Sequence, residues 1–170
     1  RETAWRFLIY NFSGGLTLLL ATAAFGLLSG STDVIGTSHQ FAGGWPPWLF
    51  AGFAFAFAVK TPIWPLHTWM PNTYAELPPP LVAVISAVQS KAGLYGFIVI
   101  ALPFLRPALI EWRWLLVALA LVSLLYGAFI ALTQTDMKRI VAYSSLSHLG
   151  LIVLAIASLN AVALQGAVVY

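Results

Sequence analysis

The composition of this 170-residue chain excludes a soluble globular domain. Hydrophobic residues make up 61% of it and charged residues only 8%, with a mean hydropathy of +0.90, whereas soluble domains carry about 25% charged residues. Its net charge of +3 is spread between apolar runs, which predicts membrane orientation and not a nucleic-acid surface. The hydrophobicity also excludes a disordered chain. A sequence without cysteine excludes disulfides, iron–sulfur ligation and thiolate metal sites.

Long apolar runs predict transmembrane helices, since about 20 apolar residues cross a bilayer. Five full spans and the start of a sixth are expected, at 7–29, 48–70, 81–102, 114–132, 140–158 and from 161 onward. Connecting loops rich in Gly, Pro and charge are expected at 30–47, 71–80, 103–113 and 133–139. We therefore predict an all-α, polytopic transmembrane helix bundle that forms one domain over 1–170. Because the chain starts at Arg1 and ends inside an apolar run, an excerpt of a longer protein is expected.

Tryptophans and basic residues mark the predicted helix ends. Six tryptophans are expected at the headgroup level, which indole rings prefer: Trp5, Trp45, Trp48, Trp69, Trp112 and Trp114. If the spans alternate in direction, one membrane face carries Arg1, Arg6, Lys138 and Arg139. The opposite face carries Arg106 and Arg113, so the first face is favoured as the cytoplasmic one.

Two lysines interrupt the apolar spans. Lys60 and Lys91 lie well inside the second and third spans, about 15–18 Å deep at helical rise, and are expected near the bilayer midplane. A lysine there costs at least about 2.5 kcal/mol and must face protein, water or an anionic partner. Since an amine outside water binds its proton less tightly, the pair predicts a proton relay. The alternative is a structural lysine in a static ion pair, whose carboxylate would have to lie outside this excerpt.

Prolines predict a break in the span that carries Lys60. Pro62 and Pro65 each remove a backbone donor and clash with the preceding turn, which frees carbonyl groups near the middle of the bilayer. Broken helices at that depth mark ion sites in transporters, although a kink without a transport role is the alternative. Lys60, Trp64 and His67 would share one face of a continuous helix, so His67 joins the predicted proton path.

Further polar residues lie inside the spans. His148 follows Ser147 in a serine-rich turn, where a neutral imidazole can pass a proton, with a hydrogen-bonded packing role as the alternative. Ser90 and Tyr95 lie next to Lys91 and one turn beyond it, and offer hydrogen-bonding groups, although such residues also serve as packing contacts. Enzyme motifs are absent from the sequence, and its histidines lack metal-ligand spacing. We therefore expect no catalytic residue, metal site or bound cofactor in this chain.

Three motifs resemble the antiporter-like subunits of respiratory complex I, and the M-type subunits of bacterial NADH:quinone oxidoreductase above all. They are VKTPIWPLHTWMP at 59–71, SKAGLYGF at 90–97 and QTDMKRIVAYSSLSHLG at 134–150. Mrp-type sodium/proton antiporters and membrane-bound hydrogenases share much of this pattern. The segment NTYAELPPP at 72–80 departs from the M-type pattern and is closer to these relatives.

The resemblance implies a larger inverted-repeat antiporter-like fold, of which this chain covers the sixth helix through the start of the eleventh. Lys60 then matches the lysine of the broken seventh helix, Lys91 the lysine of the eighth helix on a hydrated axis, and His148 the histidine of the tenth helix. It also implies that the fifth-helix glutamate that pairs with Lys60 lies before Arg1, and that the twelfth-helix glutamate of the exit lies after Tyr170.

Together these inferences predict a proton-translocating subunit of an enzyme complex whose redox chemistry occurs elsewhere. NADH, FMN, iron–sulfur clusters and quinone are expected in other subunits. Expected partners are other membrane subunits, the lipid bilayer and protons, with sodium as an option and no nucleic acid. The expected location is the bacterial or archaeal cytoplasmic membrane. The alternatives are an Mrp-type antiporter or hydrogenase subunit, and a structural membrane scaffold.

Overall fold

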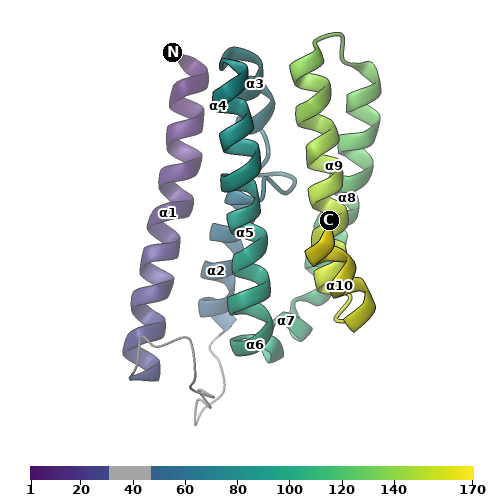
Figure 1. The fold of residues 1–170 in the computed structure, drawn as a ribbon. Helices are drawn as coiled ribbons and strands as arrows, with labels where there is room; N and C mark the ends of the chain where they lie inside the picture. Colours follow the sequence, from purple (N-terminus) through teal and green to yellow (C-terminus); the bar gives the residue numbers. More distant parts are fainter. Residues whose placement is uncertain (31–46) are drawn as a thin grey trace.

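The computed structural model describes residues 1–30 and 47–170. Within them, four helices are long and apolar enough to cross a membrane, and they stand side by side (Figure 1). They are α1 (Glu2–Ser29), a stack of segments from Pro79 to Phe104, α8 (Arg113–Thr133) and α9 (Met137–Ala157). These helices confirm the spans predicted at 7–29, 81–102, 114–132 and 140–158, although α1 begins earlier than expected. The predicted loop at 30–47 lies almost entirely outside the described residues.

The predicted span at 48–70 is the one that breaks. α2 (Pro47–Lys60) crosses one half of the bundle and ends at Lys60. Residues 61–68 turn, and α3 (Trp69–Glu76) then continues toward the other end of the bundle (Figure 1). The two halves together cross the bundle as a discontinuous helix, as the prolines predicted. A continuous face that joins Lys60 to the residues after the break is therefore not formed.

The span that carries Lys91 is a stack of short helical segments. Three α-helical pieces alternate with two π-helical turns: α4 (Pro79–Val84), Ile85–Gln89, α5 (Ser90–Gly96), Phe97–Ala101 and α6 (Leu102–Phe104). Proline is well tolerated in the first turn of a helix, which explains why this stack begins at Pro79. π turns are rare and often lie at functional sites. Here they bracket the turn that carries Lys91.

Two expected loops contain helix. The prediction of a loop at 71–80 is wrong for its first residues, since α3 extends to Glu76. The eight residues of the break do not advance as a helix does, so the helix resumes later in the chain than predicted. α3 accommodates Pro71 because this proline stands in its first turn. The loop predicted at 103–113 contains α7 (Arg106–Glu111), again with a proline in its first turn. Proline therefore starts these short helices where the sequence suggested a stop.

α8 and α9 form an antiparallel hairpin in close contact. A Cβ at Gly127 would lie 2.8 Å from the Ser147 backbone nitrogen, and one at Gly150 would lie 2.8 Å from the Leu124 nitrogen. Glycine at these two positions therefore lets the backbones approach, as small residues do in membrane helix pairs. Asp136 caps α9 by accepting the Lys138 N–H at 2.9 Å. Asn160 caps α10 (Ala161–Val169) in the same way, by accepting the Val162 N–H.

The two ends of the bundle carry the charges as predicted. Figure 1 places the N-terminus and the α8–α9 turn at one end, with Arg1, Arg6, Lys138 and Arg139. The opposite end has α6 and α7. Arg106 is the first residue of α7, and Arg113 is the first residue of α8. Large apolar side chains, such as Leu19 at 66% and Phe129 at 67% exposure, cover the outside of the long helices and suit contact with lipid or neighbouring helices.

Four of the six tryptophans predicted at helix ends are exposed near a helix end, and one is not. The four are Trp5, Trp48, Trp112 and Trp114. Trp69 is only 1% exposed and donates its Nε1–H to the Val59 carbonyl at 3.2 Å, so it packs inside the bundle. Because α3 continues from Trp69 to Glu76 toward the end of the bundle, Trp69 lies inside the bundle and not at its end (Figure 1). Trp45 lies outside the described residues.

Replacing Lys138 with methionine is expected to weaken the fold at the end of α3. The Lys138 ammonium donates to the Leu77 and Ala75 carbonyls at 2.8 and 3.3 Å, so its loss should cost about 1 kcal/mol and lower the thermal inactivation temperature of the assembled protein. Arg139→Met is the matched control, since it removes the adjacent exposed cation. Equal inactivation temperatures for the two variants would contradict this assignment.

Candidate functional site

The site begins where α2 ends at Lys60. Pro62 has no N–H to give to the Ala58 carbonyl, and the Ile63 N–H takes that place at 3.0 Å. The next carbonyl, that of Val59, accepts from the Trp69 indole. The break therefore satisfies the Ala58 and Val59 carbonyls with a shifted backbone donor and a side chain from α3. Sequence reasoning predicted the break but missed the indole, because Trp69 matched the pattern of a headgroup residue.

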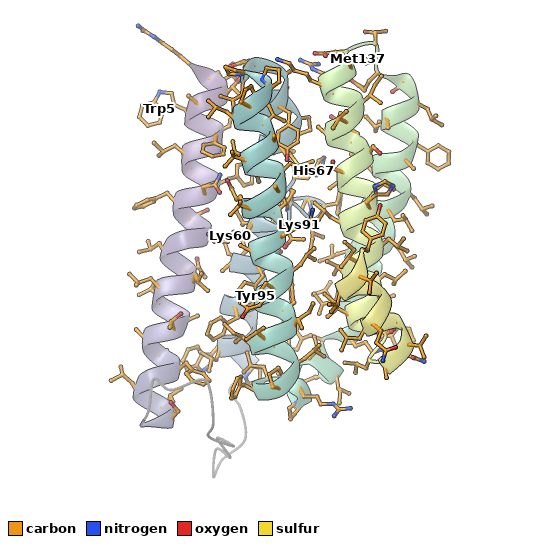
Figure 2. All side chains as sticks on the ribbon, in the orientation of Figure 1. Trp5, Lys60, His67, Lys91, Tyr95 and Met137 are labelled. Carbon is orange, nitrogen blue, oxygen red and sulfur yellow. The ribbon has the colours of Figure 1, made fainter. Side chains whose placement is uncertain are left out.

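Lys60 and Lys91 lie at about the same height in the middle of the bundle (Figure 2). Lys60 is half-buried, and Lys91 is exposed on the surface of this chain, as is Tyr95 one turn farther on. Within residues 1–30 and 47–170 there is one ion pair, between Arg6 and Glu2 near the N-terminus. Neither mid-bundle lysine therefore has a carboxylate partner in the described part of the chain.

Two buried hydroxyls lie beside these lysines. Thr61 follows Lys60 and is fully buried, and Ser90 precedes Lys91 and is 2% exposed. The Oγ1 of Thr61 and the Oγ of Ser90 make no hydrogen bond within the described residues. Thr61 directly follows α2, and Gly93 of α5 lets the Thr61 side chain approach the α5 backbone. Ser90 is the first residue of α5. Buried hydroxyls without protein partners are suited to binding water.

His67 lies inside the bundle after the break. It is 4% exposed, its Nδ1 has no partner within the described residues, and its ring packs edge-on against Tyr126 at 5.1 Å between centroids. Tyr126 in turn contacts Tyr143 at 6.4 Å. The imidazole therefore starts an aromatic and hydroxyl-bearing row that leads from the break to α8 and α9. Sequence reasoning missed this row, because the three residues lie far apart along the chain.

The structure separates Trp64 from His67, which sequence reasoning placed on one face. The Trp64 ring is 37% exposed while its backbone N–H donates to the Ser123 hydroxyl of α8 at 2.8 Å. Ser123 is fully buried and was missed by sequence reasoning, since it is a single serine in a long apolar helix. The residue Pro65 follows Trp64 through a cis peptide bond.

His148 lies on the exposed face of α9, with its ring 5.5 Å from that of Tyr170. Its neighbour Ser147 points the other way and donates to the Leu124 carbonyl of α8 at 2.9 Å. The Ser147 proton is therefore directed to α8. The described residues hold no group of three or more His, Cys, Asp or Glu that could bind a metal ion.

Taken together, the site consists of two amines, two buried hydroxyls and a buried imidazole around a broken helix. Each amine or imidazole can bind or release a proton, and hydroxyls with bound water can carry it between them. The chemistry available to this arrangement is proton transfer within the membrane.

Known proteins are similar to this chain in sequence. The family described as "NADH:quinone oxidoreductase/Mrp antiporter, TM" matches residues 1–170. The chain is 35% identical over 181 residues to NADH-quinone oxidoreductase subunit M of Mycobacterium tuberculosis, which covers 99% of this chain and 33% of that protein. It is 33% identical over 179 residues to subunit M of Rhodobacter capsulatus, with 97% and 35% covered. The chain thus spans about a third of the length of these relatives.

Two solved structures have the same fold. A chain of respiratory complex I from Thermus thermophilus with bound NADH matches with a TM-score of 0.83 and 32% identity, covering 98% of this chain and 36% of that one. A chain of the Mrp complex from Dietzia sp. DQ12-45-1b also matches with a TM-score of 0.83, at 19% identity, covering 98% and 31%. The second likeness concerns the fold alone. With the family match over all 170 residues, these likenesses show that the chain belongs to the NADH:quinone oxidoreductase/Mrp antiporter family of transmembrane subunits.

Proposed function

We propose that this chain forms the central part of a proton-translocating subunit of an NADH:quinone oxidoreductase. Lys60, His67, Lys91 and His148 carry protons along it. The observation that supports this most is that a buried hydroxyl without a hydrogen-bond partner lies next to each mid-bundle lysine in the chain: Thr61 follows Lys60 at the helix break, and Ser90 precedes Lys91. Water held by these hydroxyls would connect the amines, and each amine would release its proton when a neighbouring carboxylate loses its charge.

The redox chemistry belongs to other subunits in this proposal. NADH, FMN, iron–sulfur clusters and quinone would bind there, and this chain would hold none of them. Its partners would be other membrane subunits of the complex, in the bacterial or archaeal cytoplasmic membrane. The end that carries Arg1 and Lys138 would face the cytoplasm, since it has the larger number of basic residues. The relatives from Mycobacterium tuberculosis and Rhodobacter capsulatus are named NADH-quinone oxidoreductase subunit M, which supports the assignment to one subunit of such a complex.

Replacing Lys60 with methionine in the full-length protein is expected to remove redox-coupled proton translocation while the complex still assembles. Methionine keeps the length of the side chain but cannot carry a proton. Translocation is measured as acidification of vesicles that contain the purified complex during NADH oxidation. Arg106→Met is the control, because Arg106 is an exposed cation at the end of the bundle. Full translocation by the Lys60→Met complex would indicate a structural scaffold with static lysines.

An Mrp-type cation/proton antiporter is the second candidate. The fold match to the Mrp complex and the segment at 72–80 favour it. Vesicles that hold the full-length protein without an NADH-oxidising partner distinguish the two candidates. A pH change that depends on a sodium gradient would support the antiporter, and its absence would support the oxidoreductase subunit.

A further inference from the structure

The backbone that follows the helix break is fastened to α8 by one side chain. Between Pro62 and Pro65 only Ile63 and Trp64 have an N–H group to donate. The Ile63 N–H bonds within the break, to the Ala58 carbonyl. The Trp64 N–H crosses to α8 and donates to the Ser123 Oγ at 2.8 Å. Without this acceptor the amide would be left unpaired inside the bundle, which is costly.

The orientation of the Ser123 hydroxyl is fixed from its own helix. Its proton is donated to the Leu119 carbonyl at 2.7 Å, so a lone pair is left to accept from Trp64. Ser123 is fully buried. On its far side lies Gly150 of α9, where an added Cβ would be 3.1 Å from the Ser123 Cβ. The packing of α8 against α9 therefore sets where this acceptor lies.

The same hairpin holds the distal half of the broken helix. The buried side chains of Trp69, Met70 and Tyr74 from α3 pack with Ala142 and Leu146 of α9. Lys138, in the first turn of α9, donates to the Ala75 and Leu77 carbonyls at the end of α3. α2 packs against α1 and α5, whereas α3 packs against α1 and α9. The chain thus reaches the α8–α9 hairpin only from the break onward.

We propose that Ser123 is a positioning residue for proton transfer: by holding the Trp64 amide, it fixes the turn at 61–68 that joins Lys60 to His67. This proposal rests on the proposed function above. Trp64 lies four residues after Lys60 and three before His67, so release of its amide lets the turn rotate between them. The α8–α9 hairpin, which also carries His148, is thereby linked mechanically to the break.

The test uses the full-length protein in its assembled complex and measures two quantities. Hydrogen–deuterium exchange of the peptide that covers 61–68 reports the Trp64 amide, and vesicle acidification reports proton translocation. Three variants separate the hydroxyl from its volume: Ser123→Ala removes it, Ser123→Cys substitutes a weak acceptor of similar size, and Ser123→Thr keeps it. Ser13→Ala is the control, because the Ser13 hydroxyl bonds only within α1, to the Tyr10 carbonyl at 2.9 Å.

The proposal expects the Ala and Cys variants to exchange this peptide roughly 2- to 10-fold faster, the range that corresponds to one lost hydrogen bond. Translocation should fall by a similar factor in both, while the Thr and Ser13→Ala complexes resemble the parent. Unchanged exchange in Ser123→Ala and Ser123→Cys would overturn the proposal. So would faster exchange with translocation equal to that of Ser13→Ala. Failure of the proposed function has a different signature: Lys60→Met would translocate normally, whereas the exchange result would stand.

Discussion

Replacing Lys91 with alanine in the full-length subunit is expected to lower redox-coupled proton translocation about 50-fold or more, with the complex still assembled. Lys91 stands at mid-height of the bundle. A charge placed at that depth costs at least about 2.5 kcal/mol, so a proton cannot cross there without a residue that carries it. Because its side chain is exposed on this chain, alanine leaves no cavity inside the described core. The loss should therefore affect proton transfer and leave packing intact.

Lys91→Arg separates a titrating amine from a fixed charge. Arginine keeps the positive charge but does not release its proton in proteins, so the proposed relay expects this variant to fail as well. Val88→Ala is the matched control, since Val88 is 64% exposed on the same stack of helices. Translocation is followed as vesicle acidification, and NADH oxidation by the same samples verifies assembly. Normal translocation by Lys91→Arg would show that only the charge matters and would remove Lys91 from the relay.

The parts of this fold that the sequence predicts are those set by local chemistry. Apolar length determines which segments cross a membrane, so four long spans were located from hydropathy alone. Proline cannot continue a helix, so Pro62 and Pro65 predicted the break after Lys60. The depth of the two lysines follows from helical rise once the spans are placed. These features need no knowledge of which helices are neighbours.

The parts that escaped prediction depend on contacts between distant segments. Ser123 accepts from an amide 59 residues earlier, and no local pattern marks it among the serines of the apolar helices. Trp69 matched the headgroup pattern because sequence reasoning ended the span too early, whereas the turn at 61–68 moves the start of α3 inward. The unpartnered hydroxyls of Thr61 and Ser90 likewise become visible only when α2 is docked on α5.

Gly93 is where that docking is closest, and its replacement with alanine is the second large expected effect. An added Cβ would lie 2.7 Å from the Phe57 carbonyl oxygen and 3.0 Å from the Thr61 backbone nitrogen, and closer still to the Thr61 Oγ1. Two of these three atoms are backbone, so a change of rotamer cannot relieve the clash. The helices must separate, which costs about 1–3 kcal/mol in a packed core. The pair of buried hydroxyls would separate with them.

Gly93→Ala is therefore expected to lower the thermal inactivation temperature of the complex and to reduce translocation together. Gly15→Ala is the matched control, because nothing lies within 4 Å of a Cβ there, and alanine is the better helix former. A double variant, Gly93→Ala with Thr61→Ala, divides the effect, since it removes the clash with Oγ1 but keeps the one with the Phe57 carbonyl. It should remain less stable than Gly15→Ala. Equal inactivation temperatures for Gly93→Ala and Gly15→Ala would mean that α2 and α5 do not approach as closely as this structure has them.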